Sequence, residues 1–168
     1  ASETAALAQF DAAIAADPAY AAAHTARARS LTTIANQYGE VTRRAGLYDA
    51  AVASAERAIA IAPDLAAAHS TLGFTLFQGR LDARAARQPF ERSVLSGSGE
   101  ATVLARYAQY SARTGRDSEA VAAMTRALRL DPLNPLIYRA AGSVEYAARR
   151  YAESIPPLRK ALDMNPKM

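Results

Sequence analysis

Small and bulky apolar residues follow a fixed order along this chain, and the order recurs. Near the C-terminal end the period is 34 residues, the separation of Pro132 and Pro166. Before each proline come a small, a bulky and a second small residue at matching distances, namely Ala127 and Ala161, Met124 and Leu158, and Ala120 and Ser154. The two small positions recur before Pro18 and Pro63, as Ala13 and Ala58 and as Ala6 and Ala51. Such a period indicates a stack of helical hairpins.

Apolar residues within each period recur three and four places apart, which predicts amphipathic helices. No stretch alternates apolar and polar residues convincingly, so we predict an all-α fold, an α-solenoid of antiparallel helical hairpins with about nine helices. Asp64 and Asp117 are expected to be N-caps, and Ser2 precedes an acidic first turn. The helices are expected near 2–16, 20–37, 43–61, 65–78, 82–96, 101–113, 117–130, 135–148 and 152–164.

The repeats divide the chain, which we expect to be a single domain. Its expected parts are the second helix of an incomplete repeat (1–20), a long repeat (21–65), a divergent repeat (66–100) and two regular repeats (101–134 and 135–168). The divergent repeat has one extra residue near Gly79–Asp82. Because each repeat covers its neighbour, the missing first helix of the incomplete repeat suggests either a piece of a longer protein or a unit whose open ends pack on something else.

Pro18 and Pro63 are 45 residues apart, 11 more than the regular period. Eleven residues at about 100° each complete roughly three helical turns, so an insert can lengthen two helices without rotating their buried faces. We expect a projecting hairpin whose tip lies near residues 38–40. The tip is either a contact point, formed by the side chains of Tyr38, Arg43 and Tyr48, or a stiff spacer.

Three prolines interrupt the helical pattern. A proline inside a helix removes one backbone hydrogen bond and clashes with the preceding turn. We therefore expect helix 82–96 to bend near Ala85–Pro89. The last helix, which contains Pro156 and Pro157, is expected to start late.

The period has small residues at three fixed places and proline at a fourth. In this pattern the chain resembles the tetratricopeptide repeat family along essentially its whole length. One of these places holds Ala28, Gly73, Ala108 and Gly142. The resemblance implies a right-handed superhelix that binds a peptide or a partner domain in its concave groove. The residues that it would place in the groove are Thr25, Arg29, Thr32, Ser70, Phe74, Phe77, Thr102, Arg106, Gln109, Arg113, Arg139, Ser143 and Tyr146.

This set of groove residues is rich in arginine and aromatic side chains. Arginine pairs with carboxylates, and arginine and aromatic residues often anchor interfaces, so we expect a protein or peptide partner with acidic and apolar side chains. Phe74 and Phe77 have an alternative role, which is to fill the space beneath neighbouring helices. The alternative function is a regulatory or oligomerisation domain that pairs as a homodimer through its open ends or its long hairpin, with no peptide ligand.

A second resemblance concerns the long repeat together with two segments, residues 73–82 and 131–135. They resemble the C-terminal repeat region of bacterial winged-helix transcription regulators, and of some adenylate-cyclase-like signalling proteins. This resemblance implies that the chain is a fragment of a larger bacterial regulatory protein, in which another domain binds DNA or makes the nucleotide.

The formal net charge is +4, and arginine supplies most of the basic residues. Arg43–Arg44 and Arg149–Arg150 are isolated pairs without interleaved stacking aromatics, so we expect no direct binding of nucleic acid by this chain. No apolar run reaches the roughly 18 residues of a membrane span, and we expect no membrane contact. The expected location is cytoplasmic, or periplasmic if the full-length protein has a membrane anchor.

Residues that carry catalytic chemistry are few. The chain has no cysteine, and its two histidines, His24 and His69, occupy matching positions where repeats pack together. Gly97-Ser98-Gly99 lacks the lysine and the strand of a phosphate-binding loop. We therefore predict no enzymatic activity, no bound metal and no cofactor.

Overall fold

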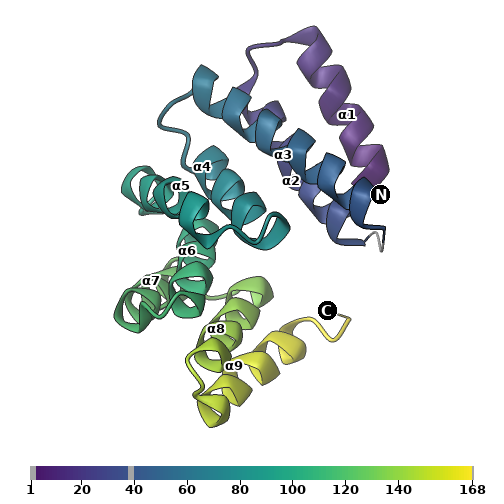
Figure 1. Ribbon diagram of the computed structural model, residues 1–168. Helices are drawn as coiled ribbons and strands as arrows, with labels where there is room; N and C mark the ends of the chain where they lie inside the picture. Colours follow the sequence, from purple (N-terminus) through teal and green to yellow (C-terminus); the bar gives the residue numbers. More distant parts are fainter. Residues whose placement is uncertain (1–2, 38–39, 168) are drawn as a thin grey trace. The chain divides into compact units, whose positions relative to one another are not determined.

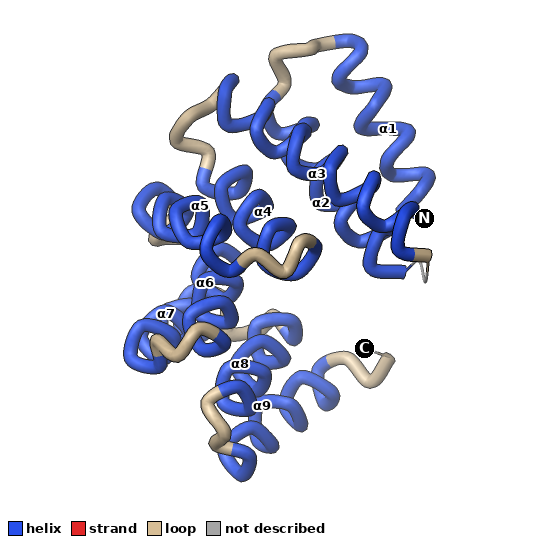
Figure 2. Tube along the Cα trace, in the orientation of Figure 1, coloured by secondary structure: helices blue, strands red, loops and turns tan. Residues whose placement is uncertain are grey.

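The computed structural model describes residues 3–37 and 40–167 (Figure 1). These residues form α-helices and one π-helical turn, η1, and no strand is found among them (Figure 2). The all-α prediction is confirmed, and each described helix boundary lies within two residues of its expected place when η1 is counted as the end of α4. The elements are α1 (Glu3–Ala16), α2 (Ala21–Gln37), α3 (Val41–Ile61), α4 (Ala66–Phe74), η1 (Thr75–Gly79), α5 (Ala83–Ser96), α6 (Ala101–Arg113), α7 (Asp117–Leu130), α8 (Pro135–Ala147) and α9 (Tyr151–Met164).

The helices gather into two compact units, Ala1–Ser96 and Gly97–Met168. In the first unit α2 packs against α3 and α4 against α5, which makes two hairpins, and α1 covers α2. In the second unit the hairpins are α6 with α7 and α8 with α9, and α8 also packs against both α6 and α7. Within each unit, successive hairpins therefore stack as repeats do.

Small residues lie at the helix crossings in both units. Ala28, Ala58, Ala108 and Ala127 are completely buried. A Cβ atom at Gly73 would lie 2.9 Å from the ring of Phe90, and one at Gly142 would lie 2.7 Å from Cδ2 of Leu158. Because real Cβ atoms do not approach so closely, a larger residue at either position would force the neighbouring side chain to shift.

The long hairpin is confirmed by the lengths of its helices. α2 has 17 residues and α3 has 21, whereas the helices of the second unit have 13 or 14. Tyr38 and Gly39 lie outside the described residues. Tyr48, one of the three residues considered for a contact point at this tip, is not available for contact, because its ring is buried and its hydroxyl donates to Asn36 Oδ1 at 2.6 Å.

The extra residue of the divergent repeat is accommodated by η1. In this turn the Arg80 amide donates to the carbonyl of Thr75, five residues back, at 3.2 Å. A π-helical turn holds one more residue than an α-helical turn, so it can absorb a single insertion. The hydroxyl of Thr75 is buried and lies 2.8 Å from that of Thr32 in α2, which ties the turn to the first hairpin.

Two expectations about helix starts are corrected. The N-cap positions of α4 and α7 are Leu65 and Arg116, not Asp64 and Asp117, and neither cap makes a side-chain hydrogen bond. Asp117 instead lies in the first turn of α7, where an acidic residue still favours the helix dipole. Two side-chain caps were not predicted from the sequence. Asn134 accepts from the Leu136 amide at 3.0 Å, and Asp82, just before α5, accepts from the Ala85 amide at 2.8 Å.

The prolines do not break their helices. α5 continues through Pro89, which is buried. The expected late start of α9 is wrong, since it begins at Tyr151, well before Pro156 and Pro157. The carbonyls that these prolines leave without a helical partner belong to Ala152 and Glu153, which are exposed, so water can satisfy them.

A glycine-to-alanine pair tests the close approach of α8 and α9. Gly142→Ala places a Cβ 2.7 Å from Leu158 Cδ2 and 3.1 Å from the Ser154 carbonyl oxygen, and should cost about 1–3 kcal/mol of unfolding free energy. Gly46→Ala, in the interior of α3, meets nothing within 4 Å and should instead stabilise by about 0.5–1 kcal/mol. Urea unfolding of both variants measures the contrast. Equal effects would show that α8 and α9 are not in close contact.

Candidate partner-binding surface

Three of the predicted groove residues are buried in the first unit. Thr25, Thr32 and Ser70 are at most 8% exposed. The hydroxyl of Thr25 donates to the Ala21 carbonyl, and that of Thr32 is within bonding distance of the Ala28 carbonyl. These three side chains therefore form part of the packing of the hairpins and leave little surface for a partner.

The remaining predicted residues of the first unit keep some exposure. Arg29 is exposed on α2. Phe74 and Phe77, at the junction of α4 and η1, are half-buried, which is compatible with either of the two roles considered for them.

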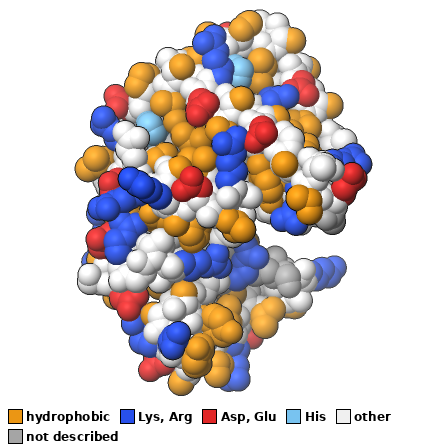
Figure 3. Space-filling view, in the orientation of Figure 1, with side chains coloured by type: hydrophobic (Ala, Val, Ile, Leu, Met, Phe, Trp, Pro, Cys, Tyr) orange, Lys and Arg blue, Asp and Glu red, His pale blue; other side chains and the backbone are white. Residues whose placement is uncertain are grey.

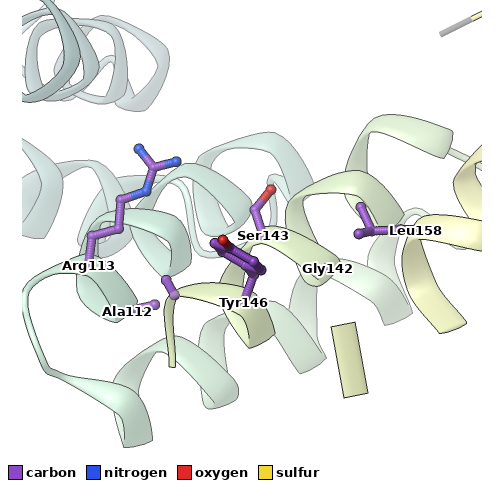
Figure 4. Close-up of a pocket in the computed structure, with 7 residues that line it drawn as sticks. Ala112, Arg113, Gly142, Ser143, Tyr146 and Leu158 are labelled. Carbon is purple, nitrogen blue, oxygen red and sulfur yellow. The ribbon is translucent and has the colours of Figure 1, made fainter. Parts of the chain in front are cut away.

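The second unit brings three predicted residues together around one hollow. The hollow has a volume of about 470 Å³ and is lined by Arg113 from α6, Ser143 and Tyr146 from α8, and four residues that the sequence pattern did not assign to it. Figure 4 shows Arg113 on one side and Leu158 on the other, with Ser143 and Tyr146 between them. The four additional residues are Ala112, Gly142, Ala147 and Leu158.

Helical periodicity explains this arrangement. Arg106, Gln109 and Arg113 follow one another at intervals of three and four residues, so they share a face of α6. Arg139, Ser143 and Tyr146 share a face of α8 in the same way, and α6 packs against α8. Thr102, one turn before Arg106, is exposed on α6. Three exposed side chains make up what we call the α6–α8 surface: Arg113 and Tyr146, which line the hollow, and Arg139, one turn before Ser143 on the same face of α8.

The additional lining residues have a common origin in close packing. Gly142 has no side chain, so Leu158 of α9 can lie directly against α8 at the edge of the hollow. Leu158 occupies the bulky position that recurs in the repeats. That position predicts packing in the core and not contact with a ligand.

The α6–α8 surface combines positive charge with an exposed aromatic ring. Arg113 and Arg139 are exposed, and neither forms an ion pair with an acidic side chain in the described part of the chain. Tyr146 is 64% exposed, and its ring meets that of Tyr151 edge-on at a centroid distance of 5.2 Å. The ring contact restrains the Tyr146 side chain before binding, so less conformational entropy is lost when a partner binds.

A second aromatic and charged cluster joins α6 to α7 and serves packing. The hydroxyl of Tyr107 donates to Glu119 Oε2 at 2.5 Å, and the guanidinium of Arg116 lies 4.7 Å from the centroid of the Tyr110 ring. Burial raises the pKa of Tyr107 above its usual value of 10.0, and the hydrogen bond to Glu119 raises it further. The phenol is therefore held in its protonated, donating form.

This raised pKa predicts a loss of stability in alkaline solution. A group whose pKa is higher in the folded state stabilises the fold below its unfolded pKa, and that stabilisation is lost as the pH rises through the folded value. Tyr107→Phe should therefore lose less unfolding free energy than the wild type between about pH 9 and 11. Tyr20→Phe, at a tyrosine that is 51% exposed, is the control and should follow the wild-type profile. A Tyr107→Phe profile parallel to that of the wild type would contradict the assignment.

The two histidines occupy equivalent places in the first unit. His24 Nε2 lies 3.1 Å from the carbonyl oxygen of Pro18, and His69 Nε2 lies 2.7 Å from that of Pro63. Both rings thus bond to the proline that ends the preceding hairpin. Among the described residues no cluster of three or more histidine and acidic side chains has the arrangement of a metal site.

Basic side chains are distributed in separate groups on the face drawn in Figure 3. They are mixed there with acidic and hydrophobic side chains. In the described residues no helix is long and apolar enough to cross a membrane.

Comparison with known proteins identifies the class of protein. A family model described as tetratricopeptide repeat matches residues 104–168. A thermophilic tetratricopeptide repeat protein of Thermus thermophilus matches with a TM-score of 0.78 at 20% identity, covering 98% of this chain and 84% of its own. YrrB, described as having an unusual peptide-binding site, matches with a TM-score of 0.60 at 19% identity, covering 98% and 79%.

MamA from Desulfovibrio magneticus RS-1 has a TM-score of 0.63 at 14% identity, with coverage of 99% of this chain and 87% of its own. No curated protein sequence gives a match. The fold defines a helical repeat protein. The matching repeat sequence then identifies residues 104–168 as tetratricopeptide repeats.

Proposed function

We propose that this chain is a non-catalytic interaction module that binds an acidic and apolar segment of a partner protein on its α6–α8 surface. Tetratricopeptide repeats are generally scaffolds for protein partners, and YrrB is described as a repeat protein with a peptide-binding site. The similarity of residues 73–82 and 131–135 to repeat regions of bacterial regulators favours a larger regulatory protein as the setting.

One observation carries this proposal. Arg113, Ser143 and Tyr146 come from two helices and surround the same hollow, whose remaining lining is largely apolar. A guanidinium without an internal acidic partner is available to a carboxylate of the guest, and forked arginine hydrogen bonds suit that group. The Tyr146 ring and Leu158 supply apolar contact beside the charge. The guest that fits is a short segment with an acidic residue next to an apolar one.

Charge reversal on the α6–α8 surface tests this proposal. Arg113→Glu combined with Arg139→Glu should weaken binding of the peptide Ac-Ala-Asp-Leu-Glu-Leu-amide at least tenfold, because an attraction becomes a repulsion. Arg129→Glu, at an exposed position of α7, changes the charge without touching the hollow. Isothermal titration calorimetry measures each affinity. Binding that is unchanged in the double variant, or equally weakened by Arg129→Glu, would remove the α6–α8 surface as the site.

Self-association is the second candidate function, and an apolar stripe on α9 supports it. Tyr151, Ile155 and Leu162 are each more than half exposed, and their spacing of four and seven residues places them on one helix face. Exposed apolar stripes of this kind often mark protein interfaces.

The two candidates differ in their response to a charge on this stripe. If α9 pairs with a second copy, the wild type should sediment as a dimer and Ile155→Glu as a monomer. Val121→Glu, at another exposed apolar residue, is the control. A wild type that sediments as a monomer at tens of micromolar would exclude this second function and leave the first unaffected.

A further inference from the structure

Two cavities of the first unit occupy equivalent places in successive repeats. The first, site A, has a volume of about 490 Å³ and lies beside α1, α2 and α3. The second, site B, has a volume of about 400 Å³ and lies beside α3, α4 and α5. Neither includes a residue of the α6–α8 surface, so binding at either cavity is independent of the proposed function.

Most of the residues around site A have a counterpart around site B. Asp11 and His24 of site A are followed 45 residues later by Glu56 and His69 of site B. In the same way, Arg57 of site A corresponds to Arg92 of site B. The matching bonds of the two histidines to proline carbonyls confirm that the backbone is equivalent at these places. Figure 3 shows histidine side chains at the surface, beside hydrophobic and acidic groups.

Site A already contains an arginine side chain of the protein itself. Arg27 donates from Nε to Asp11 Oδ1 at 2.6 Å and from Nη1 to the hydroxyl of Ser54 at 2.6 Å. These bonds join α1, α2 and α3. The place between the acidic residue and the next hairpin is thus suited to a guanidinium.

Site B retains the acidic residue but lacks the arginine. Leu72 replaces Arg27, and Pro89 replaces Ser54, so the floor of the cavity is apolar. Glu56 is exposed and forms no ion pair in the described residues. Asp64, at a place where the preceding repeat has Ala19, adds a second carboxylate. A carboxylate therefore remains where the equivalent repeat supplies its own cation.

We propose that site B binds an arginine side chain from a partner polypeptide. The guanidinium donates to the Glu56 carboxylate, as Arg27 does to Asp11, while the methylene groups of the arginine lie on Leu72 and Pro89. Arg92 is no obstacle to this pairing. Its counterpart Arg57 lines site A, and the pair of Arg27 with Asp11 forms there nevertheless.

The probe for this site is the peptide Ac-Ala-Leu-Arg-Leu-Ala-amide, with a second peptide in which citrulline replaces arginine. Citrulline keeps the shape of the side chain but removes its charge. Titration followed by NMR should show binding of the arginine peptide, with shifts for residues around site B. The citrulline peptide, and the arginine peptide with Glu56→Gln, should each bind about fivefold more weakly or worse. Equal binding of the two peptides, or no effect of Glu56→Gln, would overturn the proposal.

Two further variants of the full chain locate the interaction. Asp11→Asn changes the equivalent acidic residue of site A, which is already paired, and should leave peptide affinity unchanged. Leu72→Arg supplies site B with its own guanidinium and, provided that its circular dichroism spectrum matches the wild type, should abolish binding. Continued binding by a folded Leu72→Arg variant would contradict the proposal.

Sedimentation separates a partner polypeptide from a second copy of this chain. We expect that the wild type forms no dimer through site B, so Glu56→Gln should leave its sedimentation unchanged. A wild-type dimer lost in Glu56→Gln would assign the arginine to another copy and overturn the partner as its source. The charge reversals at Arg113 and Arg139 should leave this binding intact, so failure at site B and failure of the proposed function are distinguishable.

Discussion

The close approach of neighbouring helices, made possible by small side chains, is the constraint on which the rest of the structure depends. Alanine and glycine occupy the crossings, and even one added carbon at Gly142 would meet Leu158 and the backbone of α9. A thin core of this kind buries little apolar area per residue, so close packing supplies much of the stability. It also leaves the larger side chains to face outward, where Arg113 and Tyr146 lie beside the hollow.

Irregularities in the repeat are absorbed locally, without disturbing these crossings. The long insert extends α2 and α3 by close to whole helical turns, and the single extra residue becomes the π-helical turn η1. Thr75 in that turn then reaches Thr32, so the insertion creates a buried polar link between hairpins. The repeat thus tolerates changes in length when the buried face keeps its direction.

Equivalent positions in successive repeats have the same backbone arrangement but different side chains. Sites A and B share their backbone and their histidine bonds, yet one holds an internal arginine and the other an apolar floor. Because each repeat contacts mainly its neighbours, a substitution in one changes a single cavity and leaves the others as they were. Such an architecture can present several different binding surfaces along one chain.

The helices and their approximate limits could be predicted from the sequence, because the spacing of apolar residues and the small residues at crossings directly express helical geometry. The α6–α8 surface was also partly predictable, since Arg113, Ser143 and Tyr146 follow helical periodicity. Burial was decided only by the tertiary structure. Thr25, Thr32 and Ser70 have small side chains that pack between helices. The hydroxyls of Thr25 and Thr32 bond to backbone carbonyls, and that of Thr32 also lies within bonding distance of the Thr75 hydroxyl. The ring of Tyr48 became core because Gly79 leaves room for it, a contact between residues far apart in the chain that no local pattern records.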